Sequence, residues 1–290
     1  MNITYLKPIG YCFGVINAIN ESLKIKKQYP NKNIYVFGEL VHNKDVIKLL
    51  NNNGIITLNV QNNELDLLNS FTEKDIVIFT AHGHNKKFEE ILNNNKITFF
   101  DTTCKNVSSI FKIINQNLDR GVIYIGKKDH PETKAALSIS NKVLLYDLKD
   151  KINYDEVQFK NPIVLNQTTL SFIELKSIHE ELKEHIKNIE IIDEVCPVTR
   201  IRQESIINLD KKYDLIIIVG ASNSSNTNKL YELALKYHSH AKIIKVNNVE
   251  EVRSLDLSNY KETCLTSGTS TPLTTINDIK DYLERTYNYE

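Results

Sequence analysis

The chain has 290 residues, with 36 Lys and Arg balanced by 36 Asp and Glu, and 41% of it is hydrophobic. A net charge of zero gives no basic field for nucleic acid, and no apolar run approaches the roughly 18 residues of a membrane span. The N-terminus MNITYLKPIGYC lacks the cationic and apolar regions of a signal peptide. We therefore expect a cytoplasmic globular protein of one large domain or two to three small ones, with no nucleic-acid or membrane partner.

Three cysteines divide the sequence at equal intervals. Cys12, Cys104 and Cys196 are each separated by 92 residues. Each follows a short apolar strand (ITYL, ITFF and EII) by a few residues, and a helical pattern comes next, as in the apolar three-to-four spacing over 107–118. The sequence thus predicts three versions of one α/β unit, at 1–95, 96–187 and 188–290.

The first predicted unit continues from the Cys12 helix into the strand NIYVFGE and a loop with His42. A helix at 46–50 and the strand GIITL follow. The strand DIVIFTA then ends at a loop with His82, and a helix at 88–92 closes the unit.

The second unit repeats this order. The strand GVIYIG leads into a loop with His130 and Glu132, and a helix begins there. After the strand KVLLYDL, the strand PIVLN ends at Thr168 and Thr169, before a helix at 175–186.

The third unit does so again. The strand DLIIIVG leads into ASNSSNT and a helix at 230–237, and AKIIKV is the next strand. The strand TCLTSG then ends at Ser270, before a helix at 276–283. About four strands alternate with three helices in every unit, a pattern typical of parallel α/β sheets, whose ligands collect at the carboxyl ends of the strands.

The three spaced cysteines favour a shared ligand set. A thiolate at a helix N-terminus is suited to bind metal. Three thiolates fit either zinc with an open fourth position or a 4Fe–4S cluster with one iron free for substrate. Cys264 lies inside an apolar strand, and we expect it in the core.

The loops after the strands hold mostly neutral hydrogen-bond donors, which suit a phosphate or diphosphate. These candidate residues are His42, His82, His130, Thr168, Thr169, Ser224, Ser225, Asn226 and Ser270. Five other histidines lack this placement, and we expect them at the surface, with His84 the one closest to a candidate: they are His84, His179, His185, His238 and His240.

Glu132 is the one carboxylate that we place at a strand end facing this centre. Near a cluster and among neutral donors, it is suited to keep a raised pKa and deliver protons. The alternative is that it only starts a helix favourably.

At these residues the sequence resembles the 4-hydroxy-3-methylbut-2-enyl diphosphate reductase family (IspH/LytB). The matching motifs run through the chain in order: GYCFGV, VHN, AHG, DTTC, HPE, NQTTLS, EVCPVTRIRQ, NSSNT and TSGTSTP. The resemblance implies a cloverleaf of three pseudo-threefold-related α/β domains around a central 4Fe–4S cluster, bound by Cys12, Cys104 and Cys196. It also implies reduction of the allylic alcohol to isopentenyl and dimethylallyl diphosphate, the last step of the methylerythritol phosphate pathway.

The same resemblance implies roles for single residues. The diphosphate is bound by positions that match His42, His82, His130, Ser224, Ser225, Asn226 and Ser270. Thr168 matches the threonine near the substrate hydroxyl, and Glu132 the acid of proton transfer. The implied electron donor is a reduced ferredoxin or flavodoxin. Phe13 and the Lys127–Lys128 pair depart from the family pattern, which leaves the cluster ligands intact.

Three other readings stay open at this point. A non-redox iron–sulfur hydro-lyase needs no reductant, a zinc protein contains no sulfide, and a pure anion-binding module tolerates loss of the three cysteines.

Overall fold

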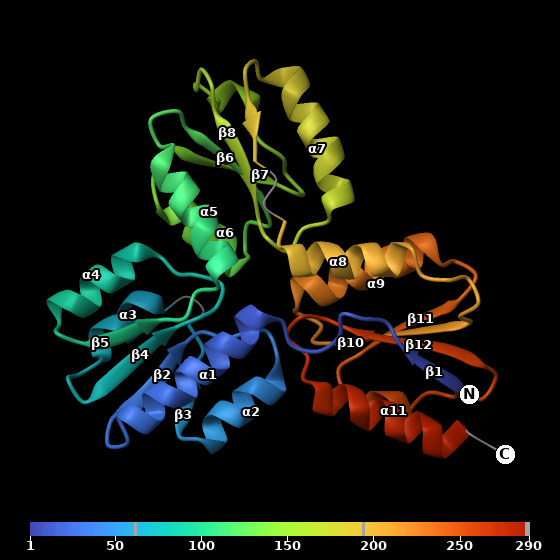
Figure 1. Cartoon of the computed structure of the whole chain (residues 1–290). Coiled ribbons are helices and arrows are strands. Elements are labelled where there is room, and N and C mark those ends of the chain that lie inside the picture. Colours follow the sequence, from blue (N-terminus) through green and yellow to red (C-terminus); the bar gives the residue numbers. More distant parts are fainter. Residues whose placement is uncertain (61–62, 193–194, 288–290) are drawn as a thin grey trace. The chain divides into compact units, whose positions relative to one another are not determined.

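The computed structural model describes residues 1–60, 63–192 and 195–287. The chain forms two compact units: unit 1 comprises Met1–Phe13, His42–Asp45 and Cys196–Glu290, and unit 2 comprises Gly14–Val41 and Val46–Val195. Unit 1 contains one four-stranded sheet and unit 2 contains two (Figure 1). Within the described residues, no helix is both long and apolar enough to cross a membrane.

The sheet of unit 1 has the strand order β1-β12-β10-β11, and all its ladders are parallel. Its strands are β1 (Asn2–Tyr5), β10 (Leu215–Val219), β11 (Lys242–Val246) and β12 (Glu262–Ser267). The helices after Cys196 are α8 (Pro197–Ile207), α9 (Ser225–Tyr237), α10 (Val249–Arg253) and α11 (Leu273–Tyr287).

The central strand β10, LIIIV, is buried along its whole length. Successive side chains of a strand point to opposite faces, so a continuous apolar run indicates a sheet covered on both sides. On one face Leu215 and Ile217 pack with Ile276 and Ile279 of α11, and α11 runs along the sheet in Figure 1. The core of unit 1 lies in this layer.

The first sheet of unit 2 has the order β3-β2-β4-β5 and is also fully parallel. Its strands are β2 (Asn33–Phe37), β3 (Ile55–Leu58), β4 (Asp75–Phe79) and β5 (Thr98–Asp101). The helices of this part of the chain are α1 (Phe13–Gln28), α2 (Lys44–Asn52), α3 (Glu64–Ser70) and α4 (Lys86–Asn94).

The second sheet of unit 2 has the order β7-β6-β8-β9, again parallel. Its strands are β6 (Val122–Gly126), β7 (Val143–Asp147), β8 (Ile163–Asn166) and β9 (Glu190–Ile191). The helices are α5 (Lys105–Gln116), α6 (Pro131–Ser138), the 3₁₀ turn Tyr154–Glu156 and α7 (Phe172–His185). The predicted α/β fold with parallel sheets is confirmed.

The strands that lead to the cysteines pair differently from the predicted unit limits. Strand β5, expected with 96–187, pairs with β4, and β9, expected with 188–290, pairs with β8. Strand β1, expected with 1–95, pairs with β12. A helix that follows one parallel strand crosses over the sheet, and the next strand then pairs beside the first. The connection through α4 therefore places β5 next to β4, and the connection through α7 places β9 next to β8. Each sheet is therefore shifted by one strand from the sequence repeat.

Gly83 allows a tight turn in the loop between β4 and α4, next to His82. Its φ is +87°, and an added Cβ would lie 2.5 Å from a ring carbon of Phe111 and 3.4 Å from Cβ of Ala135. Helices α5 and α6 therefore approach this loop as closely as a glycine permits.

We expect Gly83→Ala to lower the free energy of unfolding by about 2–5 kcal/mol, because strain from positive φ adds to overpacking. The control is Gly54→Ala, where φ is +71° and the nearest atom is Cε of the flexible Lys26 side chain at 3.2 Å. Only the backbone strain of about 1–2 kcal/mol applies there. Urea unfolding followed by circular dichroism measures both, and equal losses would contradict the close approach.

Candidate active site

Glu132 is a buried carboxyl group in the first turn of α6. The residue is 1% exposed. Its Oε1 accepts hydrogen bonds from the backbone N–H of Thr168 at 2.8 Å and from the hydroxyl of Tyr124 at 3.1 Å. Its Oε2 accepts from Oγ1 of Thr168 at 2.8 Å. The structure thus brings together the two residues predicted to be catalytic.

Burial raises the pKa of Glu132 from 4.5 to about 7, and the hydrogen bonds from Thr168 and Tyr124 oppose this rise. Removal from water disfavours the charged carboxylate, and the donors recover only part of that loss. A carboxyl group with a pKa near neutral pH can both hold and release a proton there, which is the requirement for a general acid.

Two predicted histidines lie near each other in unit 2, and one of them contacts Glu132. His130 is the N-cap of α6, and its Nδ1 accepts the backbone N–H of Glu132 at 3.2 Å. A neutral imidazole that accepts at Nδ1 has its proton on Nε2, so that nitrogen is a donor. The rings of His82 and His130 are 5.7 Å apart and roughly perpendicular. Unit 2 therefore offers two imidazoles close to a buried acid.

Cys104 belongs to the same part of unit 2. It is the N-cap of α5, and its backbone N–H donates to the carbonyl of Ala81 at 3.0 Å. This bond joins the cysteine to the residue before His82. Thr169 lies in the loop after β8, where its Oγ1 accepts from Nε2 of Gln167 at 2.8 Å.

Tyr124 and Gln167 are two residues of this site that the sequence analysis missed. Tyr124 is fully buried in β6, and its hydroxyl donates to Glu132. Gln167 is equally buried, and its Oε1 accepts the backbone N–H of Lys127 at 3.1 Å. A tyrosine inside an apolar strand needs a polar partner for its hydroxyl. The tyrosine in the strand GVIYIG therefore indicated a polar partner in the sequence itself.

In unit 1, a buried arginine lies near two of the predicted ligands. Arg202 donates to the carbonyls of Gly10 and Ser267, both at 2.6 Å. Burial lowers the pKa of Arg202 to about 10, while Cys12 and Cys196 act in the opposite direction. The backbone N–H of Cys12 donates to the carbonyl of Thr269 at 3.0 Å.

Cys196 is the N-cap of α8, the helix that contains Arg202. Two predicted thiol ligands are therefore electrostatically coupled to one buried guanidinium group. Glu194, at the start of the EVCPVTRIRQ motif, lies outside the described residues.

Unit 1 also contains the predicted polar loop residues after β10 and β12. Ser224 is the N-cap of α9 and accepts from the backbone N–H of Thr227 at 3.3 Å, and Ser225 and Asn226 form the first turn. Ser270 Oγ donates to the carbonyl of His42 at 3.1 Å. Because β10 and β12 are neighbouring parallel strands, these loops leave the same edge of the sheet.

Asn226 is 2% exposed, and neither its Oδ1 nor its Nδ2 makes a hydrogen bond within the described part of the chain. Buried amide groups are nearly always paired, so an orphaned one calls for a polar partner that the chain does not supply. This is the observation in unit 1 that points most directly to a ligand.

The fourth cysteine and the other histidines lie outside the clusters around Glu132 and Arg202. Cys264 is 1% exposed in β12, and burial raises its pKa to about 12. It is a core thiol, as expected. The surface prediction is wrong for His238, which is 2% exposed with Nε2 2.6 Å from the carbonyl of Ile206. It is also wrong for His84, whose side chain is 5% exposed.

Comparisons with known proteins identify the family of the chain. Residues 3–284 match the LytB protein family. The chain is 35% identical over 294 residues to 4-hydroxy-3-methylbut-2-enyl diphosphate reductase of Malacoplasma penetrans, with 98% of each chain covered. It is 32% identical over 290 residues to the Bacillus subtilis protein of the same name, covering 98% of this chain and 91% of that one.

Two solved structures share the fold. The E-1-hydroxy-2-methyl-but-2-enyl-4-diphosphate reductase of Plasmodium falciparum matches with a TM-score of 0.87 and 28% identity, covering 99% of this chain and 89% of that one. An (E)-4-hydroxy-3-methyl-but-2-enyl diphosphate reductase, described as the terminal enzyme of the non-mevalonate pathway, matches with a TM-score of 0.71 and 25% identity, covering 98% and 99%. These 4-hydroxy-3-methylbut-2-enyl diphosphate reductases are relatives of the chain. The chain therefore belongs to the LytB family.

Proposed function

We propose that the chain reduces 4-hydroxy-3-methylbut-2-enyl diphosphate to isopentenyl and dimethylallyl diphosphate, the last step of the methylerythritol phosphate pathway. Its family and the names of its relatives support this activity. Two electrons and two protons enter, the bond between carbon and the hydroxyl oxygen breaks, a C–H bond forms and water leaves. The observation that carries the proposal is the buried Glu132, whose raised pKa of about 7 suits it to supply a proton.

The cofactor in this proposal is a 4Fe–4S cluster bound by Cys12, Cys104 and Cys196. The donor set fits: Cys104 and Cys196 are helix N-caps, and the buried guanidinium of Arg202 is electrostatically coupled to Cys12 and Cys196. When bound, the cluster supplies electrons and one open iron position for the substrate hydroxyl. A reduced ferredoxin or flavodoxin is the proposed electron source.

We assign neutral donors in each unit to the diphosphate. In unit 2, Nε2 of His130 is a donor because Nδ1 is already an acceptor, and His82 lies next to it. In unit 1, the buried amide of Asn226 has hydrogen-bonding capacity that the described chain does not use. Neutral donors bind a diphosphate without adding the strong charge that would resist its release. We also assign His42, Thr169, Ser224, Ser225 and Ser270 to this set.

Proton delivery falls to Glu132 and Thr168. The threonine hydroxyl donates to Oε2 at 2.8 Å when the carboxyl group is ionised. When Oε2 is protonated this bond reverses, so Oε2 gives its proton to Oγ1 while the hydroxyl passes its own proton to the leaving oxygen. Tyr124 holds the other carboxyl oxygen and fixes the direction of this bond. Burial keeps water from competing for the proton.

Replacement of a ligand thiol tests the cofactor. We expect Cys12→Ser, Cys104→Ser and Cys196→Ser each to lose the intact cluster or nearly all activity, because three ligands leave no spare. The control is Cys264→Ser, a buried core position in β12 that should keep both. Iron and sulfide analysis of anaerobically purified protein measures the result. A zinc protein would instead contain no sulfide, and a Cys264 variant that behaves like the other three would refute the assignment.

Asn226→Leu tests the diphosphate site. Loss of one donor to a buried charged group costs about 1.5–3 kcal/mol, which is roughly ten- to hundred-fold in substrate affinity. The matched control is Asn228→Leu on the same helix, because both ends of the half-buried Asn228 amide have partners in the chain: Nδ2 donates to the carbonyl of Ser222 and Oδ1 accepts from Nζ of Lys245. Calorimetric titration with the substrate measures both. Equal affinities in the two variants would show that Asn226 does not bind the diphosphate.

Glu132→Gln and Tyr124→Phe together test the proton route. General acid catalysis contributes about 10²–10⁴-fold, so Glu132→Gln should bind substrate yet turn over at least about a hundred-fold more slowly. In the parent, the acid form is lost as pH rises through about 7, and turnover should fall there. The Tyr124 hydrogen bond lowers the pKa of Glu132, so Tyr124→Phe should move this fall to higher pH. Near-normal turnover of Glu132→Gln, with only a lower melting temperature, would assign Glu132 to starting the helix.

A further inference from the structure

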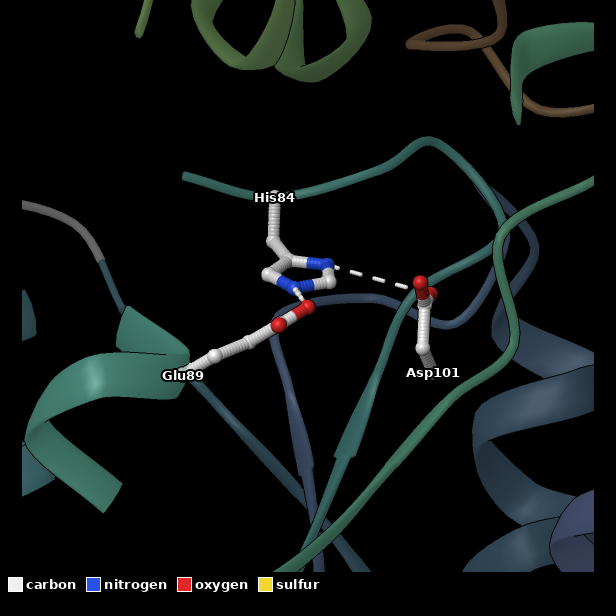
Figure 2. A group of neighbouring side chains, drawn as sticks. All are labelled: His84, Glu89 and Asp101. Carbon is white, nitrogen blue, oxygen red and sulfur yellow. Dashed lines mark hydrogen bonds and ion pairs between the residues drawn. The ribbon is translucent and has the colours of Figure 1, made fainter. Parts of the chain in front are cut away.

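A buried histidine lies between two carboxylates in unit 2, apart from the residues assigned above. Figure 2 shows the ring of His84 with Glu89 of α4 on one side and Asp101, the last residue of β5, on the other. The side chain of His84 is 5% exposed, and its ring stacks on Phe79 at 3.7 Å. The three side chains each offer a ligand atom, and these atoms lie within 4.8 Å of one another.

The contact with Glu89 determines which ring nitrogen of His84 is unprotonated. Nε2 lies 2.8 Å from Oε1 of Glu89, a hydrogen-bond distance, so Nε2 is the protonated nitrogen of the neutral ring. Nδ1 is then an acceptor. Burial lowers the pKa of His84, although Asp101 and Glu89 act in the opposite direction. The neutral ring therefore directs a lone pair toward Asp101.

Nδ1 of His84 has no hydrogen-bond partner in the described part of the chain, and it lies 3.8 Å from Oδ1 of Asp101. Oδ1 accepts from the backbone N–H and the hydroxyl of Thr103 and has no proton to offer Nδ1, so a cation between the two atoms would pair with both. Zinc bonds to histidine nitrogen and carboxylate oxygen are about 2.0–2.2 Å long, so one ion can reach both atoms at an angle of about 130°. A shift of about 0.4 Å gives the tetrahedral angle.

The surroundings match those of bound metal ions. A histidine ligand usually donates its other nitrogen to a carboxylate, which is the part that Glu89 takes here. A ligand carboxylate is itself usually hydrogen-bonded, and Oδ1 of Asp101 accepts the backbone N–H of Thr103 at 2.9 Å. A pocket of about 220 Å³ lined by His84, Asp101 and Ser108 leaves room for water ligands and an entry path.

One nearby charge opposes a cation. Nζ of Lys86 lies 2.5 Å from Oε1 of Glu89 and 3.8 Å from Oδ2 of Asp101. Its side chain is 56% exposed, so it can swing into solvent when an ion enters. Lys112 also lines the pocket. These lysines weaken binding without blocking either ligand atom.

We propose that Nδ1 of His84 and the carboxylate of Asp101 bind a divalent transition-metal ion such as Zn²⁺, with Glu89 orienting the ring. Asp101 lies three residues before Cys104, and His84 lies two residues after His82. The ion joins the loop after β4 to the end of β5. It thereby stiffens the segments that position His82 and Cys104.

The test is zinc binding by the anaerobically purified holoprotein. The protein is dialysed against ZnCl₂ at buffered free concentrations, and zinc and iron per chain are counted by mass spectrometry. We expect one zinc per chain with the iron content unchanged. Glu89→Gln should weaken binding about 10–100-fold, as loss of such an orienting carboxylate does, and Asp101→Asn should weaken it at least as much.

Two further variants on α4 sharpen the test. Glu90→Gln removes the same charge as Glu89→Gln from an exposed position and should bind zinc as the parent does. Lys86→Gln should bind more tightly, because it removes the opposing ammonium group. Zinc affinity that is unchanged in both Glu89→Gln and Asp101→Asn would overturn the proposal. Zinc uptake matched by loss of iron would also overturn it, because the ion would then occupy the cysteines.

Discussion

The burial of the Glu132 carboxyl group is the constraint on which the chemistry of unit 2 depends. A carboxylate that is 1% exposed is costly to ionise, and the chain supplies three hydrogen bonds rather than a cation to offset that cost. The group is therefore poised between its two protonation states near pH 7. A neighbouring arginine or lysine would hold it ionised and remove its proton at working pH.

The same hydrogen bonds position the surrounding residues. Thr168 is tied to Glu132 through both its backbone and its hydroxyl, which joins the loop after β8 to the start of α6. The backbone N–H of Glu132 in turn occupies Nδ1 of His130 and leaves Nε2 as the donor. One buried acid thus sets the orientation of a proposed proton donor and of a proposed diphosphate ligand.

In unit 1 the buried charged group that positions the neighbouring loops is a cation. Arg202 joins the loop of Cys12 to the end of β12 through the carbonyls of Gly10 and Ser267. Its burial lowers its pKa only to about 10, so the guanidinium stays charged near neutral pH beside Cys12 and Cys196. In unit 2, by contrast, the described residues that offset the burial of the acid are the hydrogen-bond donors Thr168 and Tyr124.

Much of the fold could be predicted from the sequence because its signals are local. Continuous apolar runs such as LIIIV in β10 marked buried parallel strands, and the polar residues after them marked the strand ends. The pairing of β5 with β4 was missed, since sequence repeats show periodicity but not which strands share hydrogen bonds. The two-unit division likewise depends on long-range packing.

The candidate site was predictable in its residue types but not in its energetics. Glu132 and Thr168 were chosen from their places at strand ends, and the structure adds Tyr124 as the third partner of the carboxyl group. The burial of His84 could not be seen in the loop sequence AHGHN, because it depends on the ring of Phe79 in β4. The orphaned amide of Asn226 likewise emerges only when the start of α9 is packed.

The most direct test of this account is the pKa of the Glu132 carboxyl group itself. Infrared difference spectra over a pH titration, with Glu132→Gln subtracted, isolate the stretch of the protonated group. We expect a midpoint at about pH 7, well above the ordinary value of 4.5. A midpoint near 4.5 would mean that the group is ionised at working pH, and the proposed proton source would be contradicted.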